Sequence, residues 1–290
     1  MHKGTFHNQF EFERWKDIKT SGYLTDIRDL IVQIPGPDQL TGNNIADLGN
    51  VLEKNNWVIY ESEQRLWSKS DLVNFADFFG LKECDQHLYG EEGVSDIRVS
   101  DSNQQGEFIP YTNKGLNWHT DGYYNPNQNW VTAIVLHCNQ PAVSGGVNQI
   151  VDPDLLFIHL YKRNPDYLKA LMKPDCLTIP GYDNGLGHVR PDSQGPVFWF
   201  NHNGILQMRY SQRKTNITWS NDPLLFEARE IIDDWLVSAP VIAEHRLSSG
   251  QGILSRNVLH KRTAFNDHSE GRRHLLRARY LDSIEFPEEE

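Results

Sequence analysis

The second half of the chain is dominated by short runs of β-branched and aromatic residues that are separated by turn residues. Runs this short and this closely punctuated favour a barrel or a double-sheet jelly roll over a parallel α/β sheet. We therefore predict a mainly β fold. The expected strands lie at residues 131–136, in a hairpin over 196–209 that turns near Asn203-Gly204, and at 241–243, 252–254 and 274–280.

Helical patterns flank and interrupt these strands. Residues 41–55 carry a capping candidate followed by apolar residues at helical spacing, a strand pattern follows at 57–60, and a second helix is expected over 70–79. Further helical insertions are expected over 153–172 and 223–237. Because we find no internal repeat, low-complexity tract or long linker, we predict a single domain over residues 1–290, with a helical N-terminal part and helical insertions in the barrel.

The charge and the hydropathy pattern restrict the possible partners. A formal net charge of −11 and a pI near 5.5 argue against a nucleic-acid surface, so we expect a small-molecule substrate. No run approaches the roughly 18 apolar residues of a membrane span, and the first residues lack a signal-peptide pattern, so we expect no membrane association and a cytoplasmic location.

Three widely spaced cysteines indicate reduced thiols. The sequence does not define the oligomeric state.

Two side chains with metal-binding chemistry stand two positions apart at His119 and Asp121. Along a strand, this spacing points both side chains to the same face, so that both can reach one metal ion. A His-x-Asp pair alone is weak support, because polar pairs at strand ends commonly cap a turn.

A third ligand candidate, His260, closes an apolar stretch that we predict to be one strand from Gly252 through Leu259. Two histidines and one carboxylate form a facial triad, which leaves three positions of an octahedral iron(II) open for a bidentate 2-oxo acid and dioxygen. The single carboxylate leaves the site cationic, and a cationic site attracts an anionic cosubstrate. We predict that His119, Asp121 and His260 hold the metal and carry the catalysis.

The last predicted strand is rich in arginine. We expect Arg279 to lie on an exposed basic edge strand, where charge prevents aggregation. Arg273 differs, because a guanidinium inside a barrel needs a bidentate anion to offset its desolvation. The distal carboxylate of 2-oxoglutarate has that shape.

Several segments resemble the taurine dioxygenase-like iron(II)/2-oxoglutarate oxygenases, and more closely the branch that contains gamma-butyrobetaine hydroxylase. The resemblance covers residues 117–152 and 249–282. Its motifs are Trp118-His119-Thr120-Asp121, Leu136-His137-Cys138, Gly145-Gly146, Val151-Asp152, Val258-Leu259-His260-Lys261-Arg262-Thr263-Ala264-Phe265 and Arg272-Arg273-His274-Leu275-Leu276-Arg277.

The resemblance implies a double-stranded β-helix, which is a jelly roll, with iron(II) as the metal and 2-oxoglutarate and dioxygen as cosubstrates. It implies that Arg273 pairs with the distal carboxylate of 2-oxoglutarate and that Arg277 lies near its other end. Many relatives carry Thr or Ser shortly after the Gly-Gly pair, and here Asn148 is the substitute. Hydroxylation is the default outcome, and desaturation or ring closure can follow the same radical step.

For the substrate, we predict a small polar metabolite with a charged group, such as an amino acid, a betaine or a related acid. The aromatic residues Trp118, Tyr123 and Tyr124 flank the metal motif and are candidates to hold a quaternary ammonium by cation–π attraction. Arg209 and Tyr210 are candidates to bind a substrate carboxylate. Packing in the core is the alternative for each aromatic residue.

Two other functions use the same triad. Two histidines and an aspartate also suit tetrahedral zinc in a hydrolase. A non-enzymatic jelly-roll binding protein could use a metal only to staple its barrel. Turnover of 2-oxoglutarate to succinate distinguishes both from an oxygenase.

Overall fold

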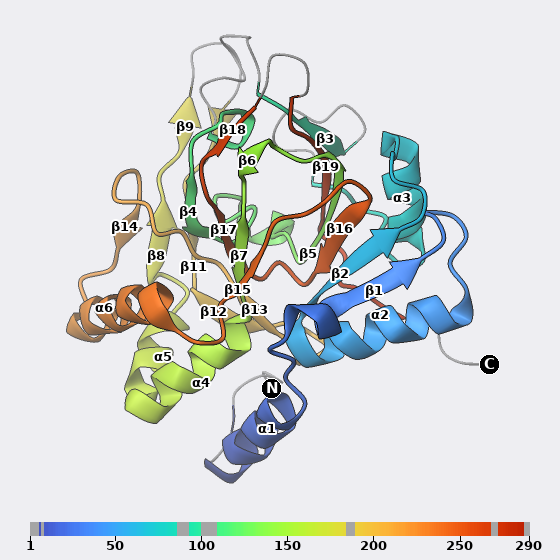
Figure 1. The fold of residues 1–290 in the computed structure, drawn as a ribbon. Helices are drawn as coiled ribbons and strands as arrows, with labels where there is room; N and C mark the ends of the chain where they lie inside the picture. The colour runs from blue at the N-terminus through green and yellow to red at the C-terminus, as the bar shows by residue number, and fades with distance from the viewer. Residues whose placement is uncertain are drawn as a thin grey trace.

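A computed structural model describes residues 6, 9–85, 93–99, 109–183, 189–267 and 272–286 (Figure 1). Over these residues the fold is mainly β, with two principal sheets, several two- and three-stranded ones and six α-helices. No helix in the described ranges is long and apolar enough to cross a membrane. The first five residues, which entered the signal-peptide expectation, lie outside the described residues.

The larger sheet has six strands in the order β1-β2-β16-β5-β19-β3. The β1–β2 pair is parallel and the other pairs are antiparallel, so the sheet interleaves segments from both ends of the chain. Its strands are β1 (Ile31–Ile34), β2 (Trp57–Ser62), β3 (Val94–Ile97), β5 (Ala133–Gln140), β16 (Gln251–Ser255) and β19 (His274–Tyr280).

The smaller sheet has four antiparallel strands in the order β15-β7-β17-β4. Its strands are β4 (Leu116–His119), β7 (Asn148–Val151), β15 (Ala243–His245) and β17 (Leu259–Arg262). The shorter strands are β6 (Ser144–Gly145), β8 (Leu177–Ile179), β9 (Tyr182–Asp183), β10 (Val189–Arg190), β11 (Ser193–Gly195), β12 (Phe198–Phe200), β13 (Leu206–Met208), β14 (Thr218–Trp219) and β18 (Phe265–Asn266).

A cavity lies between the two sheets. Leu136 and Ile253 line it from the larger sheet, and Ile150 and His260 line it from the smaller sheet. Because side chains alternate along a strand, the opposite face of each sheet is free to pack against helices.

Each sheet has its own hydrophobic core behind it. Helices α2 (Gly42–Asn55) and α3 (Lys69–Asp77) contribute to the core of the larger sheet, and helices α4, α5 and α6 to that of the smaller sheet (Figure 1). Helix α1 (Gln9–Ser21) packs Phe12 into the second core. The two cores hold the sheets as fixed walls of the cavity.

The expected helices are present, with one difference. Helix α2 begins after Thr41, whose side chain caps it, and α3 and α6 (Pro223–Ser238) lie where their apolar spacing predicted. The insertion expected as one helix over 153–172 is two helices, α4 (Pro153–Arg163) and α5 (Pro165–Leu171). The break falls at Asn164, which is extended, because proline cannot donate to the preceding turn.

Two predictions about the C-terminal strands are wrong. The stretch from Gly252 to His260 is two strands in different sheets, β16 and β17, and the chain crosses between them at Asn257, whose φ is +50°. Strand β19 is not an edge strand, since it pairs with β5 and β3. Arg279 is buried accordingly, with Nη2 2.8 Å from Asp85 Oδ2 and Nη1 donating to the Tyr124 hydroxyl at 2.7 Å.

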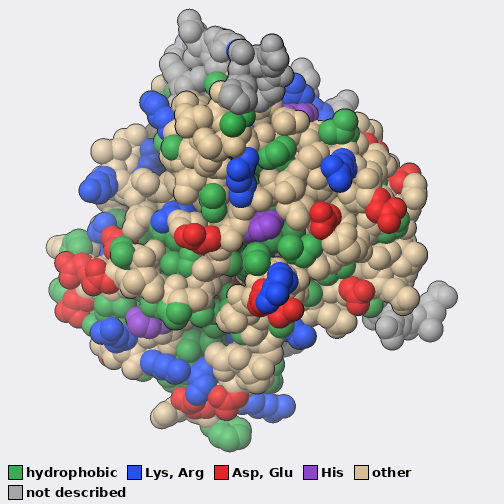
Figure 2. Space-filling view, viewed as in Figure 1, with side chains coloured by type: hydrophobic (Ala, Val, Ile, Leu, Met, Phe, Trp, Pro, Cys, Tyr) green, Lys and Arg blue, Asp and Glu red, His purple; other side chains and the backbone are tan. Residues whose placement is uncertain are grey.

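The described surface is chemically mixed. Figure 2 shows one face on which Lys and Arg side chains are interspersed with Asp and Glu rather than gathered in one basic patch. Cys84, Cys138 and Cys176 form no disulfide with one another, and Cys138 and Cys176 are buried.

Candidate metal centre and anion pocket

Three ligand side chains meet at one end of the cavity. Strands β4 and β17 pair so that His119 lies opposite His260, and Asp121 follows two residues after His119. Within the described part of the chain, these three form the one group of His, Cys, Asp or Glu whose ligand atoms all lie within 4.8 Å of one another. His119 Nε2 is 3.6 Å from Asp121 Oδ1, and the imidazole centroids are 4.4 Å apart.

Both imidazoles are held in the tautomer that suits a metal. His119 Nδ1 donates to the Asn117 carbonyl at 2.8 Å, and His260 Nδ1 donates to the Val258 carbonyl at 2.9 Å. Because a carbonyl can only accept, each ring keeps its proton on Nδ1 and leaves the Nε2 lone pair available. Burial and the neighbouring His119 lower the pKa of His260 to about 4, so that it is neutral at pH 7.

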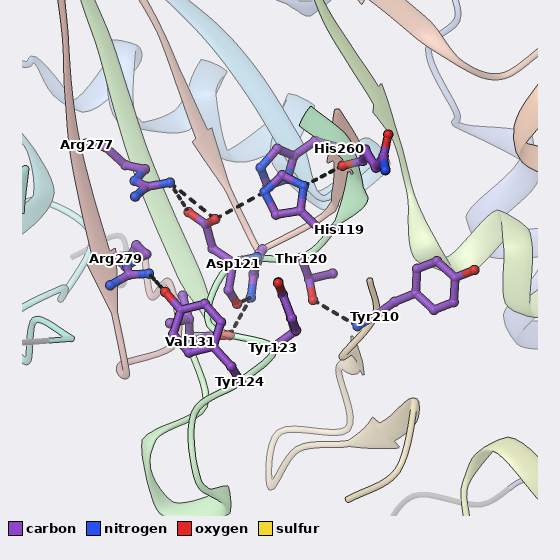
Figure 3. A network of polar contacts seen from close by, with 12 residues as sticks. His119, Thr120, Asp121, Tyr123, Tyr124, Val131, Tyr210, His260, Arg277 and Arg279 are labelled. Carbon is purple, nitrogen blue, oxygen red and sulfur yellow. Dashed lines mark hydrogen bonds and ion pairs between the residues drawn. The ribbon is translucent and has the colours of Figure 1, made fainter. Parts of the chain in front are cut away.

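Asp121 completes the donor set as an ionised carboxylate. Figure 3 shows it between Arg277 and the imidazoles, with Arg277 Nη1 3.1 Å from Oδ2 and 3.3 Å from Oδ1. Burial raises the pKa of Asp121, but the charge of Arg277 outweighs it and holds the pKa well below its ordinary value. Oδ2 faces the Arg277 guanidinium, and Oδ1 is the oxygen that lies near His119 Nε2, so two imidazole nitrogens and one carboxylate oxygen converge. The donor set therefore fits iron(II).

Asn257 fixes the backbone that carries Asp121. Its Oδ1 accepts from the Asp121 amide at 2.8 Å, and its Nδ2 donates to the carbonyls of Asp121 at 2.9 Å and Val131 at 2.7 Å. Its left-handed conformation is one that Asn tolerates better than most residues. Sequence reasoning did not assign this role, although an Asn shortly before a ligand strand was a usable signal.

We predict that Asn257→Ala lowers the free energy of unfolding by about 2–4 kcal/mol, because three buried groups lose their partner. We also expect weaker metal binding, since the peptide of Asp121 loses its support. Urea unfolding and a manganese(II) titration measure the two effects. Asn216→Ala is the matched control, because Asn216 is also left-handed (φ +54°) but exposed. Equal losses in both variants would place the effect in backbone strain rather than in the hydrogen bonds.

Arg273 supplies a free cation to the cavity. Its side chain is buried and lines the cavity, its guanidinium carbon lies 5.0 Å from the Phe265 ring centroid, and it forms no hydrogen bond or ion pair with the described residues. Burial lowers the pKa of Arg273 to about 10, and Asp267 offsets this only in part. A buried guanidinium without a partner is costly, so this arrangement suits an anionic ligand.

The other two residues predicted for the cosubstrate also line the cavity. Arg277 is already engaged with Asp121. Asn148 lies on β7, and its Nδ2 donates to the His245 carbonyl only at 3.5 Å, which leaves its amide weakly held. A third guanidinium in the cavity, Arg262, was missed by sequence reasoning. Its position two residues after His260 on one strand was the signal.

None of the five residues predicted for the substrate lines the cavity, and three of them are held in structural contacts away from it. Trp118 is buried in the core behind the smaller sheet, because it neighbours His119 on a strand and therefore points the other way. The Arg209 guanidinium donates to the carbonyls of Tyr123, Leu177 and Ser193. Tyr210 is buried, and its hydroxyl donates to Asp233 at 3.2 Å. All three are occupied by structural contacts.

Tyr123 and Tyr124 do lie beside the metal centre. The Tyr123 ring centroid is 6.5 Å from that of His119, and its hydroxyl accepts from Arg213 at 3.2 Å. Tyr124 packs edge-on against Tyr123, and its carbonyl accepts from Arg190 at 2.9 Å. This pair is therefore bordered by two further arginines.

Three clustered ligand candidates and a buried guanidinium in one cavity suit an enzyme that binds one metal ion and an anionic cosubstrate. The chain belongs to the family described as taurine catabolism dioxygenase TauD, TfdA family, whose sequence profile matches residues 21–279. It is 31% identical over 203 residues to a uridine-5′-phosphate dioxygenase from Amycolatopsis sp., a match that covers 65% of this chain and 68% of that protein.

Solved structures share the fold at low sequence identity. A taurine dioxygenase from Burkholderia xenovorans superposes with a TM-score of 0.59 at 15% identity, covering 87% of both chains. PvcB, an iron- and alpha-ketoglutarate-dependent oxygenase from an isonitrile synthetic pathway, superposes with a TM-score of 0.56 at 14% identity, covering 87% of this chain and 85% of that one.

These matches establish the chemistry of the protein. It is a 2-oxoglutarate-dependent dioxygenase that uses iron(II), 2-oxoglutarate and dioxygen. A zinc hydrolase and a metal-stapled binding protein, which use the same three ligands, are therefore set aside.

Proposed function

We propose that His119, Asp121 and His260 bind the iron(II), and that Arg273 binds the distal carboxylate of 2-oxoglutarate. The observation that carries this proposal is that one cavity is lined by the three ligand candidates and by a buried guanidinium that forms no ion pair with the described residues. When bound, iron(II) supplies the activation of dioxygen coupled to the oxidation of 2-oxoglutarate to succinate and carbon dioxide. The protein's residues orient the reactants and exclude water.

We propose that the substrate is a small molecule with a negatively charged group. Arg262, Arg273 and Arg277 line the cavity, and Asp121 is the one carboxylate among the described residues that do so. Tyr123 and Tyr124 lie beside the iron ligands with Arg213 and Arg190 against them. This excess of cations favours an acid over a cation.

The aromatic residues around the metal motif argue against a betaine in particular. Lys261 lies 4.9 Å from the ring centroid of Trp118, Arg213 lies 5.9 Å from that of Tyr123, and Arg190 lies 5.4 Å from that of Tyr124. The protein's own cations therefore occupy the positions that a quaternary ammonium would need. We retain the amino acids and related acids of the sequence-based prediction, ahead of betaines.

A second candidate substrate is a nucleoside 5′-phosphate. The 31% identical relative is a uridine-5′-phosphate dioxygenase. A phosphate monoester carries close to two negative charges at neutral pH, which matches the cationic surroundings of Tyr123 and Tyr124.

The proposal also includes three predictions from the sequence, which concern the exact fold, the reaction outcome and the branch of the family. The two antiparallel sheets that enclose the cavity support a double-stranded β-helix in one domain. Hydroxylation remains the proposed outcome, and the gamma-butyrobetaine hydroxylase branch remains a prediction from the motifs alone.

A substrate panel tests the proposal. The iron(II)-loaded protein is incubated aerobically with 2-oxoglutarate and with amino acids, dicarboxylic acids, betaines or uridine 5′-phosphate, and succinate and oxidised product are measured together. We expect coupled turnover with an acid or a phosphate and none with a betaine. Coupling only to a neutral or cationic compound would contradict the proposed substrate class but leave the iron site intact.

A further inference from the structure

Arg262 occupies an unusual position beside the metal centre. It is the last residue of β17 and stands two positions after His260, so both side chains leave the strand on the same face. It is buried, with 5% of its surface exposed, and it lines the cavity. The iron chemistry described above assigns it no task.

The Arg262 guanidinium is bound to one short segment of the chain. Nη2 donates to the carbonyls of Thr112 at 3.0 Å and Lys114 at 2.5 Å, and Nη1 donates to that of Pro110 at 3.4 Å. The guanidinium also packs over the Phe265 ring at 4.9 Å. One planar side chain therefore gathers three carbonyls within five residues, which a lysine ammonium with its single donor centre cannot do in the same geometry.

The segment that Arg262 holds forms part of the cavity wall. Residues 109–115 comprise the short helix η2 (Ile109–Tyr111) and the turn before β4, and Pro110 and Leu116 line the cavity at either end of that turn. Strand β4 continues from Leu116 to the ligand His119. A displacement of this segment would move Pro110, which lines the cavity, and the start of β4.

We propose that Arg262 is a positioning residue that holds residues 109–115 as a wall of the iron cavity. The segment is also attached by the Phe265 amide, which donates to the Asn113 carbonyl at 3.1 Å, and by the buried Tyr111, so it should loosen rather than detach when Arg262 is replaced. Arg262 does not serve as a cosubstrate ligand in this proposal, since its Nη atoms are already engaged with backbone carbonyls.

Hydrogen exchange of the metal-free protein tests the proposal without depending on turnover. We expect amides of residues 109–115, including that of Thr112, to exchange at least about tenfold faster in Arg262→Met, with a smaller increase in Arg262→Lys and little change elsewhere. Arg256→Lys is the matched control, because Arg256 donates to Asn56 and does not line the cavity. Unchanged exchange in residues 109–115, or an equal increase throughout the chain in both Arg262 variants, would overturn the proposal.

Binding of 2-oxoglutarate distinguishes a role of Arg262 in positioning the cavity wall from a role in binding the cosubstrate. We expect the dissociation constant of 2-oxoglutarate, measured by calorimetry on the manganese(II)-loaded protein, to change less than about threefold in Arg262→Lys, because Arg273 is intact. A tenfold or larger increase would overturn the proposal by making Arg262 part of the cosubstrate site. The hydrogen-exchange experiment does not depend on the identity of the substrate. A negative result there would contradict the role of Arg262 without contradicting the proposed function.

Discussion

Replacing His119, Asp121 or His260 by Ala is expected to reduce substrate-coupled succinate formation by at least about a thousandfold. Loss of the partners that merely orient a ligand costs about 10- to 100-fold, and loss of the ligand itself should cost more. The three ligand atoms lie within 4.8 Å of one another, and both histidines are already in the required tautomer, so no neighbouring side chain can replace one of them without rearrangement. Manganese(II) titration and succinate assays measure the loss.

The three variants should differ in stability, which provides an internal check. His119→Ala and His260→Ala remove imidazoles, whereas Asp121→Ala leaves the half-buried Arg277 without its 3.1 Å partner. We therefore expect Asp121→Ala to be the least stable of the three in urea unfolding. His202→Ala is the control, because His202 is exposed in the turn between β12 and β13 and should retain full activity. Activity near that of the control in any ligand variant would disprove the assignment.

The three candidate ligands could be picked from the sequence by residue type, whereas the approach of His260 to His119 depends on the long-range pairing of β17 with β4. Strand β4 ends at His119, so the alternation that predicted a shared face does not extend to Asp121, whose backbone Asn257 holds in the following turn. The same alternation places Trp118 on the opposite face, so its distance from the cavity was also predictable from the strand pattern. The structure places Trp118 in the core as this rule requires.

Other features depended on long-range pairing that the sequence does not display. Arg279 is buried because β19 lies between β5 and β3, and β3 is nearly 180 residues earlier in the chain. Arg209 is satisfied by carbonyls from three separate segments, so its structural role was invisible from its neighbours. The split of the Gly252–His260 stretch between two sheets was foreshadowed by Asn257, but a single Asn is too common to decide a crossing.

Arg273→Lys is expected to raise the KM for 2-oxoglutarate by about 10- to 100-fold while changing kcat much less. Lys keeps the positive charge but loses the two-pronged donor geometry that matches a carboxylate. An effect confined to KM indicates lost binding that is equal in the ground and transition states, as expected for a group remote from the reacting atoms. Arg98→Lys is the control, because Arg98 is an exposed arginine beside His274.

A second substitution separates the contribution of the positive charge of Arg273 from that of its donor geometry. Arg273→Met removes the cation and should weaken 2-oxoglutarate binding further than Arg273→Lys, since the cavity then loses the guanidinium that has no other described partner. Calorimetric binding of 2-oxoglutarate to the manganese(II)-loaded protein reports this without turnover. If neither variant shifts the affinity, the role passes to Arg277, which lies four residues further along β19 and lines the same cavity. Because Arg277 also neutralises Asp121, its replacement should lower both kcat and 2-oxoglutarate affinity, a pattern that distinguishes it from Arg273.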